Sequence, residues 1–554
     1  MNRRLILIFS GLLISLSSNF FILEGQINSY NYFYRIYFRD KGSYHISDFT
    51  PSGLFSQRAV QRRQKEGISG LDYKDLPVYE GYLGTILSMG LQLHCTSRWM
   101  NTGLFKSQDP ADLSSLRTLP FVENVKIVKN PVIKKGYKDK LAFKANLDVN
   151  IYDKPITMLN GDLVHASGYR GEGKLIAVLD GGFINSDKIS SLEGLRGRNG
   201  ITGTYDFVRR SEFVYDYHNH GTYVLSVLAG VIDSYIEGSG PDADFLLIRT
   251  EDTSSEFPVE EDFWAAGAEY ADSAGCDIIS SSLGYFIFDD PSMDYKFSDM
   301  DGRTAFVTRT AEAAASRGIV VVNSAGNERN SAWIHIIAPS DGDSVLAIGA
   351  VDPDKIIASF SSAGLSFDRR IKPDVVAQGV SVPVQAGFPD ESGLGSTVVL
   401  GSGTSFSCPV ISGMLACVMQ AVPQAKASDI VSVIRSVSDR YNSPDSLYGY
   451  GIPDMVNAII SLQKELMSEP LSAVTIGPNP FTDFVNVRLK DNPEFLRFEI
   501  FNAGGVPIKS VYYSHYLSLS WTLNGLQNLT QGLYIVRITT AQGKFTSKII
   551  KIGN

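Results

Sequence analysis

The middle of this chain alternates strand-like runs with helical stretches, and this alternation limits the possible folds more than any other feature. The run at 175–179 is apolar throughout and lies between glycines, which is typical of a strand buried on both faces. Further strand-like runs at 277–282 and 319–323 each follow a helical stretch, at 264–273 and 308–316. Because parallel strands need helical crossovers, we predict an α/β fold with a mainly parallel, doubly wound sheet covered on both faces.

Polar side chains stand at the ends of these predicted elements. Asp180 ends the run at 175–179, so its carboxylate is predicted at the tip of a strand. His220 opens a second apolar stretch whose residues recur at helical spacing. Catalytic groups of open parallel sheets gather at the carboxyl ends of the strands, so Asp180 and His220 are candidates for a paired carboxylate and imidazole.

The segment at 401–409 places a serine directly before a buried helix. Gly401 and Gly403 allow a tight turn and a close approach of the backbone, and apolar residues recur at helical spacing after Ser405. Ser405 is therefore predicted at the start of a helix, beside free N–H groups and the positive end of the helix dipole. That position would stabilise an oxyanion formed by nucleophilic attack. The alternative interpretation is a serine that only caps the helix.

A nucleophilic serine needs a base that takes its proton, and the base needs a carboxylate that fixes its tautomer. Asp180, His220 and Ser405 supply these three residue types in the chain order Asp, His, Ser. This is the order found in subtilisin.

Four motifs resemble those of the subtilisin-like serine proteases, the subtilases. Three of them are the segments 178–182, 220–224 and 403–409. The fourth is Ser324-Ala325-Gly326-Asn327, which resembles the segment that supplies the oxyanion-hole asparagine. The resemblance extends over roughly residues 147–460 and implies a subtilisin-like catalytic domain, which we place at 146–465.

The resemblance also implies a role for each site residue. Ser405 would be the nucleophile, His220 the general base, Asp180 the group that orients the imidazole, and Asn327 a donor to the oxyanion. The segment Ser282-Leu283-Gly284 resembles the backbone that pairs with an extended peptide substrate. Gly181 departs from the family pattern, which usually has Ser or Thr there, and removes a hydroxyl near the triad but no catalytic group.

The amino-terminal part is predicted to be processed. Residues 1–25 have a basic start followed by an apolar run too short to span a membrane, so we predict a secretory signal. No later stretch is judged long and apolar enough to span, so the exported, mature protein is expected to lack a membrane span.

Residues 26–145 are predicted to form a small α+β domain followed by a Lys-rich linker. The run at 34–39 alternates like an edge strand, and a charged helix with a solvated face is predicted around Arg58, Arg62, Arg63 and Lys65. By its position this domain resembles the subtilase propeptide, which acts as folding chaperone and inhibitor. Its basic linker, at 129–146, is interpreted as an exposed segment that proteases cut rather than as a nucleic-acid patch.

Residues 466–554 change to short alternating strands separated by turn residues, which predicts a small β-sandwich. Pro478-Asn479-Pro480, Gly532-Leu533-Tyr534 and the basic end at 548–551 resemble the C-terminal sorting domain of type IX secretion, an apparatus of Bacteroidetes-type bacteria. This implies that apparatus as a partner and export across the inner and outer membranes. The alternative is a carbohydrate-binding or spacer sandwich.

Charge and cysteine content exclude some classes of function. The net charge of −9 argues against nucleic acid as a partner. Four cysteines do not make a disulfide framework, so free, mostly buried thiols are expected. No cofactor is expected to be required. Asp341 with Asp343, and Asp289 with Asp290, are candidates for calcium, but neither pair has calcium-loop spacing, and no metal site is assigned.

Together these features predict a secreted or surface serine endopeptidase that acts on proteins or peptides and is made as a self-processing zymogen. A second hypothesis is a surface adhesin whose protease-like domain only binds peptides, which the complete triad argues against. An esterase of the α/β-hydrolase kind requires G-x-S-x-G and the order Ser, acid, His. The segment 403–407 ends in serine and the chain order is Asp, His, Ser instead, so this hypothesis is rejected.

Overall fold

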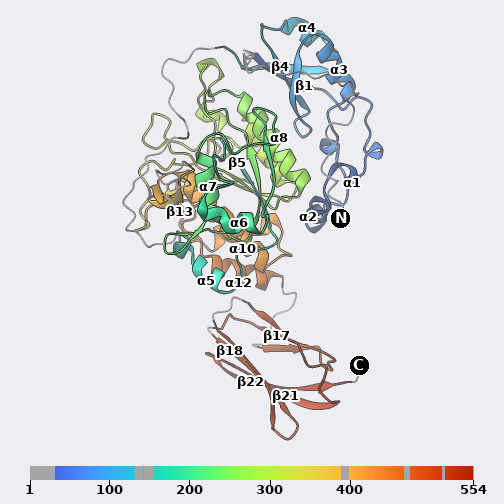
Figure 1. The fold of residues 1–554 in the computed structure, drawn as a ribbon, viewed down its shortest axis with the longest axis vertical. Coiled ribbons are helices and arrows are strands. Elements are labelled where there is room, and N and C mark those ends of the chain that lie inside the picture. The colour runs from blue at the N-terminus through green and yellow to red at the C-terminus, as the bar shows by residue number, and fades with distance from the viewer. Residues whose placement is uncertain are drawn as a thin grey trace.

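A computed structural model gives the fold of most of the chain. It describes residues 32–131, 141, 155–387, 398–466, 474–493, 495–514 and 518–552. The predicted signal at 1–25 and most of the Lys-rich linker lie outside the described residues. Three bodies follow one another along the long axis: an amino-terminal sheet with helices, a central α/β body and a carboxyl-terminal pair of sheets (Figure 1).

The central body is built on a parallel sheet. In the described part of the chain this sheet has seven strands in the order β13-β12-β11-β10-β5-β9-β6, and all neighbouring strands are parallel. The strands are β5 (Leu175–Asp180), β6 (Ile201–Asp206), β9 (Asp244–Arg249), β10 (Ile278–Ser281), β11 (Val320–Ser324), β12 (Leu346–Val351) and β13 (Val375–Gln378). The predicted fold class is confirmed.

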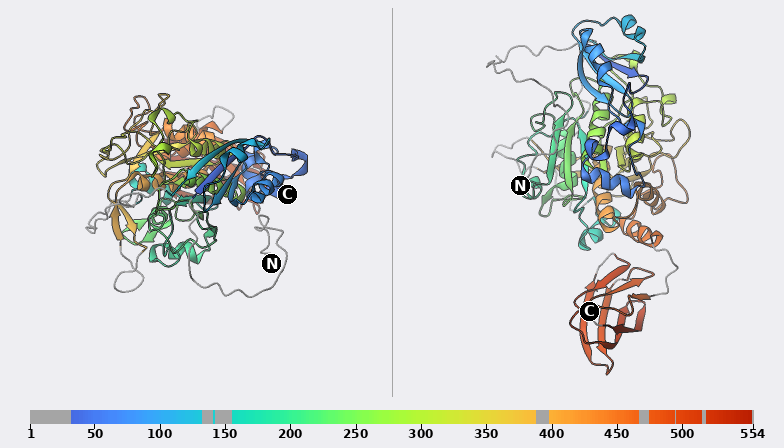
Figure 2. Two further views of the ribbon diagram at one scale, coloured as in Figure 1. Left: turned by 90° about the horizontal axis from the view of Figure 1, so that it is seen from above. Right: turned by 90° about the vertical axis from the view of Figure 1, so that its right-hand side faces the viewer.

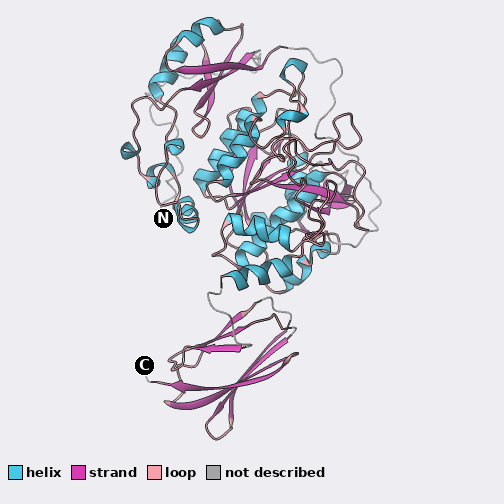
Figure 3. Ribbon diagram, turned by 180° about the vertical axis from the view of Figure 1, so that it is seen from behind, coloured by secondary structure: helices cyan, strands magenta, loops and turns pink. Residues whose placement is uncertain are grey.

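Helices cover both faces of this sheet (Figure 3). On one face lie α7 (His220–Ala229) and α10 (Thr404–Ala421), and on the other α8 (Val259–Ala274) and α9 (Phe306–Ala315). On β5, Ile176 and Val178 pack in the cluster of α7 and α10, whereas Leu175, Ala177 and Leu179 pack in that of α8 and α9. The strand is apolar throughout because both of its faces are buried.

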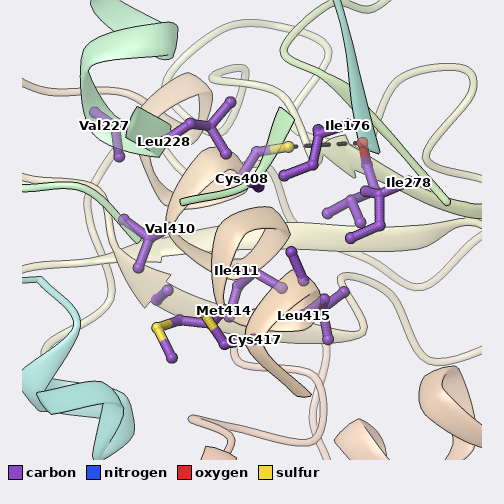
Figure 4. Packing of buried hydrophobic residues seen from close by; sticks show 14 of the residues in the cluster. Ile176, Val227, Leu228, Ile278, Cys408, Val410, Ile411, Met414, Leu415 and Cys417 are labelled. Atoms are coloured by element: carbon purple, nitrogen blue, oxygen red, sulfur yellow. Dashed lines mark hydrogen bonds between the residues drawn. The ribbon is translucent and has the colours of Figure 1, made fainter. Parts of the chain in front are cut away.

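Helix α10 crosses the core of the central body. Its side chains Ile411 and Leu415 belong to the same buried cluster as Ile176 and Ile278 (Figure 4). By length and composition alone this helix could span a membrane, but 89% of it is buried inside the protein. The prediction that no stretch after the signal is long and apolar enough to span a membrane was therefore wrong for residues 404–421. The apolarity of this stretch is that of a core helix.

Shorter elements complete the central body. These are α5 (Gly161–Ala166), α6 (Glu193–Gly197), α11 (Ala427–Ser436), α12 (Met455–Glu465), β7 (Val231–Ile232), β8 (Ile236–Glu237), β14 (Val382–Gln385) and β15 (Val398–Gly401).

The amino-terminal sheet is antiparallel and has the order β2-β3-β1-β4. Its elements are β1 (Tyr32–Phe38), β2 (Gln92–Ser97), β3 (Thr102–Ser107), β4 (Val122–Lys129), α1 (Pro51–Leu54), α2 (Gln57–Lys65), α3 (Glu80–Ser88) and α4 (Leu113–Thr118). The prediction of β1 as an edge strand was wrong, because β1 lies between β3 and β4. Its polar residue Arg35 does not face water. The guanidinium nitrogens of Arg35 are buried against Asp262 of α8 and donate to its carboxylate oxygens at 2.6–2.9 Å.

The prediction that the charged helix has a solvated face was wrong for Arg62 and Arg63. This helix is α2, and the side chains of Arg62 and Arg63 are buried, with 2% and 4% of their surface exposed. Both pair with the buried carboxylate of Asp272 in α8. The guanidinium groups of Arg62 and Arg63 therefore bond to the Asp272 carboxylate, more than 200 residues away along the chain, instead of to water.

The carboxyl-terminal body has two antiparallel sheets, of order β16-β17-β20 and β19-β18-β21-β22, around one apolar cluster. The strands are β16 (Val474–Gly477), β17 (Val485–Leu489), β18 (Phe495–Asn502), β19 (Pro507–Ser514), β20 (Ser520–Leu523), β21 (Gly532–Thr540) and β22 (Gly543–Lys551). The sequence patterns missed β16, β19 and β22. Pro507 hid β19, because proline is tolerated as the first residue of an edge strand, and β19 lies at the edge of its sheet.

Candidate active site

Asp180 and His220 meet at the carboxyl edge of the central sheet. Asp180 is the last residue of β5, and His220 is the first residue of α7. The Nδ1 atom of His220 lies 2.8 Å from Oδ1 and 2.9 Å from Oδ2 of Asp180, and both side chains are buried. A proton on Nδ1 directed at the carboxylate leaves Nε2 as the nitrogen that can accept another proton.

The glycines around this pair let the backbones of β5 and α7 approach closely. A side chain on Gly221 would collide with the carbonyl oxygen of Gly182. The neighbouring His218 supports the same turn, because its Nδ1 accepts a hydrogen bond from the backbone N–H of His220 at 3.1 Å. The structure thus places His218 beside the start of α7, whereas His220 contacts Asp180.

Ser405 lies at the start of α10, as the second residue of the helix after Gly403 at the N-cap. It is 9% exposed. The ring of the next residue, Phe406, lies 6.3 Å from the ring of His220, so α10 brings Ser405 to the same edge of the sheet. Among the described residues no hydrogen bond joins Ser405 to His220.

Asn327 follows β11 and contacts the same end of α10. Its Oδ1 accepts hydrogen bonds from the backbone N–H of Thr404 at 2.9 Å and from the Thr404 hydroxyl at 3.0 Å. A Cβ atom on Gly403 would lie 3.7 Å from Asn327 Nδ2, so the amide nitrogen faces the turn before Ser405. The carboxamide is therefore anchored through its oxygen, with its donor beside the predicted nucleophile.

The predicted substrate-binding segment directly follows β10. The side chains of Ser282 and Leu283 are buried, and Ser282 Oγ donates to the carbonyl oxygen of Ser405 at 2.9 Å. Asn323 Nδ2 donates to the carbonyl oxygen of Leu283, also at 2.9 Å. The sequence patterns missed these supporting roles of Ser282 and Asn323. Pairing of Ser282, Leu283 and Gly284 with a peptide backbone stays a prediction.

Leu141, the one described residue of the predicted linker between 132 and 154, lies against the site. A Cβ atom on Gly181 would lie 2.6 Å from Leu141 Cδ1 and 3.0 Å from Thr253 Cγ2. The Ser or Thr that subtilases usually carry at this position would need Leu141 to move. The missing side chain at Gly181 therefore makes room for a linker residue next to Asp180.

Cys408 has a structural role on α10. Its Sγ lies 3.5 Å from the carbonyl oxygen of Ser281 and 3.6 Å from that of Val322. Burial raises the pKa of this thiol to about 12, so it stays protonated and is not a second nucleophile. Cys95, Cys276, Cys408 and Cys417 are all free, and all but Cys95 are fully buried, which confirms the predicted free thiols.

The described residues hold no group of three or more His, Cys, Asp or Glu side chains that could bind a metal ion. Asp341 accepts hydrogen bonds from the Thr308 hydroxyl at 2.6 Å and from the backbone N–H of Gly302 at 2.8 Å. Asp290 accepts one from Asn130 Nδ2 at 2.6 Å. One member of each candidate calcium pair therefore already bonds within the protein.

Models of three known protein families match parts of the chain. The model of the subtilase family matches residues 171–451, that of the peptidase S8 propeptide domain of Bacteroidota matches 33–142, and that of the secretion system C-terminal sorting domain matches 475–552. Subtilisin DY of Bacillus licheniformis is 30% identical over 298 residues, which cover 53% of this chain and 93% of that relative. Subtilisin E of Bacillus subtilis (strain 168) is 29% identical over 301 residues, covering 54% of this chain and 68% of the relative. The solved structure of MycP1 from the ESX-1 type VII secretion system covers 59% of this chain and 90% of that chain, with 19% identity and a TM-score of 0.45.

Proposed function

Because the chain belongs to the subtilase family of serine endopeptidases, we propose that Asp180, His220 and Ser405 are its catalytic triad. The observation that carries the proposal is the pair of hydrogen bonds from His220 Nδ1 to the Asp180 carboxylate, at the sheet edge where α10 begins. The substrates are proteins or peptides, and the catalytic domain is proposed to comprise residues 146–465.

The proposed reaction is hydrolysis of a peptide bond in two steps. Ser405 Oγ attacks the scissile carbonyl carbon while His220 Nε2 takes its proton, and Asp180 stabilises the imidazolium. The oxyanion lies at the amino end of α10, where the backbone N–H of Ser405 and Asn327 Nδ2 donate to it. The imidazolium then protonates the leaving amine. Water, activated by His220, releases the acyl group from Ser405.

A serine-reactive fluorophosphonate probe separates this proposal from the peptide-binding adhesin. We expect the probe to label the mature protein at Ser405, because only an activated serine reacts quickly with it. Peptide mapping of the labelled protein identifies the residue. A folded protein that binds peptides but takes up no label at Ser405 would favour the adhesin.

Replacing Asn327 by alanine is expected to lower kcat by about 10²–10³-fold with little change in KM, because the lost donor acts on the oxyanion and not on the bound substrate. Steady-state kinetics with a peptide substrate measure both constants. Asn330→Ala in the same loop is the matched control. Among the described residues, the side chain of Asn330 makes one hydrogen bond, from Nδ2 to Ser359 Oγ at 3.4 Å. A loss confined to KM would contradict the assignment.

The protease carries a propeptide, and we propose that it removes this segment itself. The contact between Leu141 and Gly181 supports the proposal, because it puts the linker next to Asp180. Lys129, at the end of β4, pairs with Asp252 at 2.9 Å and so leads the chain toward this site. We propose that the cut falls between Lys140 and Asn150, and that residues 26–145 are the propeptide with its linker.

The protein is secreted or lies on the cell surface, as its sorting domain indicates. We propose that residues 1–25 direct it across the inner membrane and that residues 466–554 are recognised by the type IX apparatus at the outer membrane. No cofactor is proposed to be required, calcium is given no site, and nucleic acid is not a proposed partner.

Deleting residues 472–554 is expected to leave a folded, active protease that stays in the periplasm. Between the described residues of the two bodies, Gln463 Oε1 accepts from the N–H of Leu519 at 2.9 Å, and Lys464 pairs with Asp491 at 3.3 Å. Fractionation of cells and activity in each fraction measure the result. Surface delivery of the truncated protein at the normal level would instead favour the spacer sandwich.

A further inference from the structure

Residues 40–79 form an arm that leaves the amino-terminal sheet after β1 and returns to it at α3. The arm carries α1 and α2. It runs along the central body (Figures 1 and 2).

The arm contacts the central sheet at the edge opposite to the active site. Arg58 donates to the carbonyl oxygen of Gly173 at 2.9 Å, two residues before β5, and forms an ion pair with Asp277, directly before β10. Asp180 lies at the other end of β5, about 17 Å away at roughly 3.3 Å per residue. Contacts of the arm are thus separate from those that the linker makes beside Asp180.

One buried carboxylate receives several guanidinium groups at this edge. Asp272 pairs with Arg62, with Arg63 at 2.7 Å and with Arg98 at 2.8 Å. Its side chain is fully buried. The three guanidinium groups lower the pKa of Asp272 against the effect of burial, so its charge persists.

The same arginines satisfy carbonyl groups at the ends of two helices. Arg58 Nε donates to Gly275 O at 2.9 Å, and Arg62 Nη1 donates to Cys276 O at 2.6 Å, both after the end of α8. Arg62 Nε donates to Arg317 O at 3.3 Å, after the end of α9. Such carbonyls lack partners within their own helix, and cations are favoured there.

The end of α2 contacts a third helix. Glu66 accepts a hydrogen bond at 3.1 Å from the N–H of Ala427, the first residue of α11. Lys65 Nζ donates to Ala425 O at 2.9 Å. A carboxylate at the start of α11 complements the positive end of its dipole. A side chain on Gly318 would collide with Glu66, so this glycine makes room for the arm.

We propose that this edge is a binding site for α2 that keeps the propeptide attached after the linker has been cut. We call it the α2 site, and it consists of Asp272, Asp277, the carbonyl groups of Gly275, Cys276 and Arg317, and the N–H group of Ala427. Its ligand is a helix with arginines at i, i+4 and i+5, which share one face and are supplied here by Arg58, Arg62 and Arg63. The proposal rests on the proposed cleavage of the linker.

The contacts at the α2 site named above are made by the arm and not by the linker. Cutting the linker therefore does not remove them. Release of the propeptide then requires that α2 leave a site in which its buried guanidinium groups have no access to water. Detachment is therefore controlled at the edge of the sheet that lies opposite to the proposed cleavage.

The test uses full-length Ser405→Ala protein in which residues 145–150 are replaced by the recognition sequence of a site-specific protease. The added protease makes the cut, so the outcome does not depend on self-processing. Binding between the two fragments is then measured by dilution and size-exclusion chromatography. The variants are Arg62→Ala with Arg63→Ala, the milder Arg58→Ala, and the control Arg39→Ala, an exposed arginine of the same propeptide.

The parent and Arg39→Ala should remain complexes of two fragments after the cut. The double variant should raise the Kd between the fragments by about 100-fold or more, because it leaves Asp272 buried with fewer partners. Arg58→Ala should raise it less, since its side chain is 37% exposed. If the double variant does not fold, the Kd measured for Arg58→Ala decides whether the α2 site holds the fragments together. A Kd equal to that of Arg39→Ala in every variant that folds would overturn the proposal, as would fragments of the parent that separate at once.

Discussion

Replacing Ser405 by alanine should abolish peptide hydrolysis, lowering kcat by about 10⁶-fold, the scale known for the loss of a triad member. It should also leave a folded, full-length precursor with an intact linker. Leu141 lies against Gly181, next to Asp180, and a bond held there would have a high effective concentration at Ser405, so the same substitution should remove both activities. The measurements are turnover of a peptide substrate and N-terminal sequencing after incubation of the single purified protein.

Ser407→Ala is the matched control for this experiment. Ser407 lies on the same helix and donates its hydroxyl only to Thr404 O, at 3.1 Å, so the variant should mature and retain activity. If the Ser405→Ala protein matured by itself at the wild-type bond, self-processing would be excluded. Maturation only after active enzyme is added would show that the cut is made between molecules.

The parallel sheet could be predicted from the sequence because its strands are buried on both faces. A strand such as β5 then has a continuous apolar run with a polar residue where it reaches the sheet edge, and Asp180 is that residue. The start of α8 could not be predicted in this way. Glu261 looks like a solvent-exposed residue, yet it is buried and pairs with Arg35 of the amino-terminal body. Local pattern does not reveal a partner that lies more than 200 residues away.

The same limit applies to the arm and to the site. Arg62 and Arg63 give α2 the pattern of a solvated helix, because a charge that pairs with Asp272 and a charge that faces water look alike in a sequence. Ser282 holds the Ser405 carbonyl only because β10 packs beneath α10. The positions of Asp180, His220 and Asn327 could be predicted because each stands at the end of an apolar element. Their mutual distances required the tertiary structure.

The two neighbouring histidines should respond very differently to substitution. His220→Ala is expected to lower kcat by about 10⁶-fold, because the serine loses its only base and the Asp180 carboxylate loses the imidazole that it orients. His218→Ala should keep most of the activity, since the Nδ1 atom of His218 accepts a hydrogen bond from the backbone of His220 and does not contact the Asp180 carboxylate as His220 does. Steady-state kinetics on a peptide substrate give both values. Because activity is proposed to be needed for maturation, each variant is first cut by an added protease at an engineered linker site. The assignment of the base would be wrong if His218→Ala inactivated the cut enzyme while His220→Ala did not.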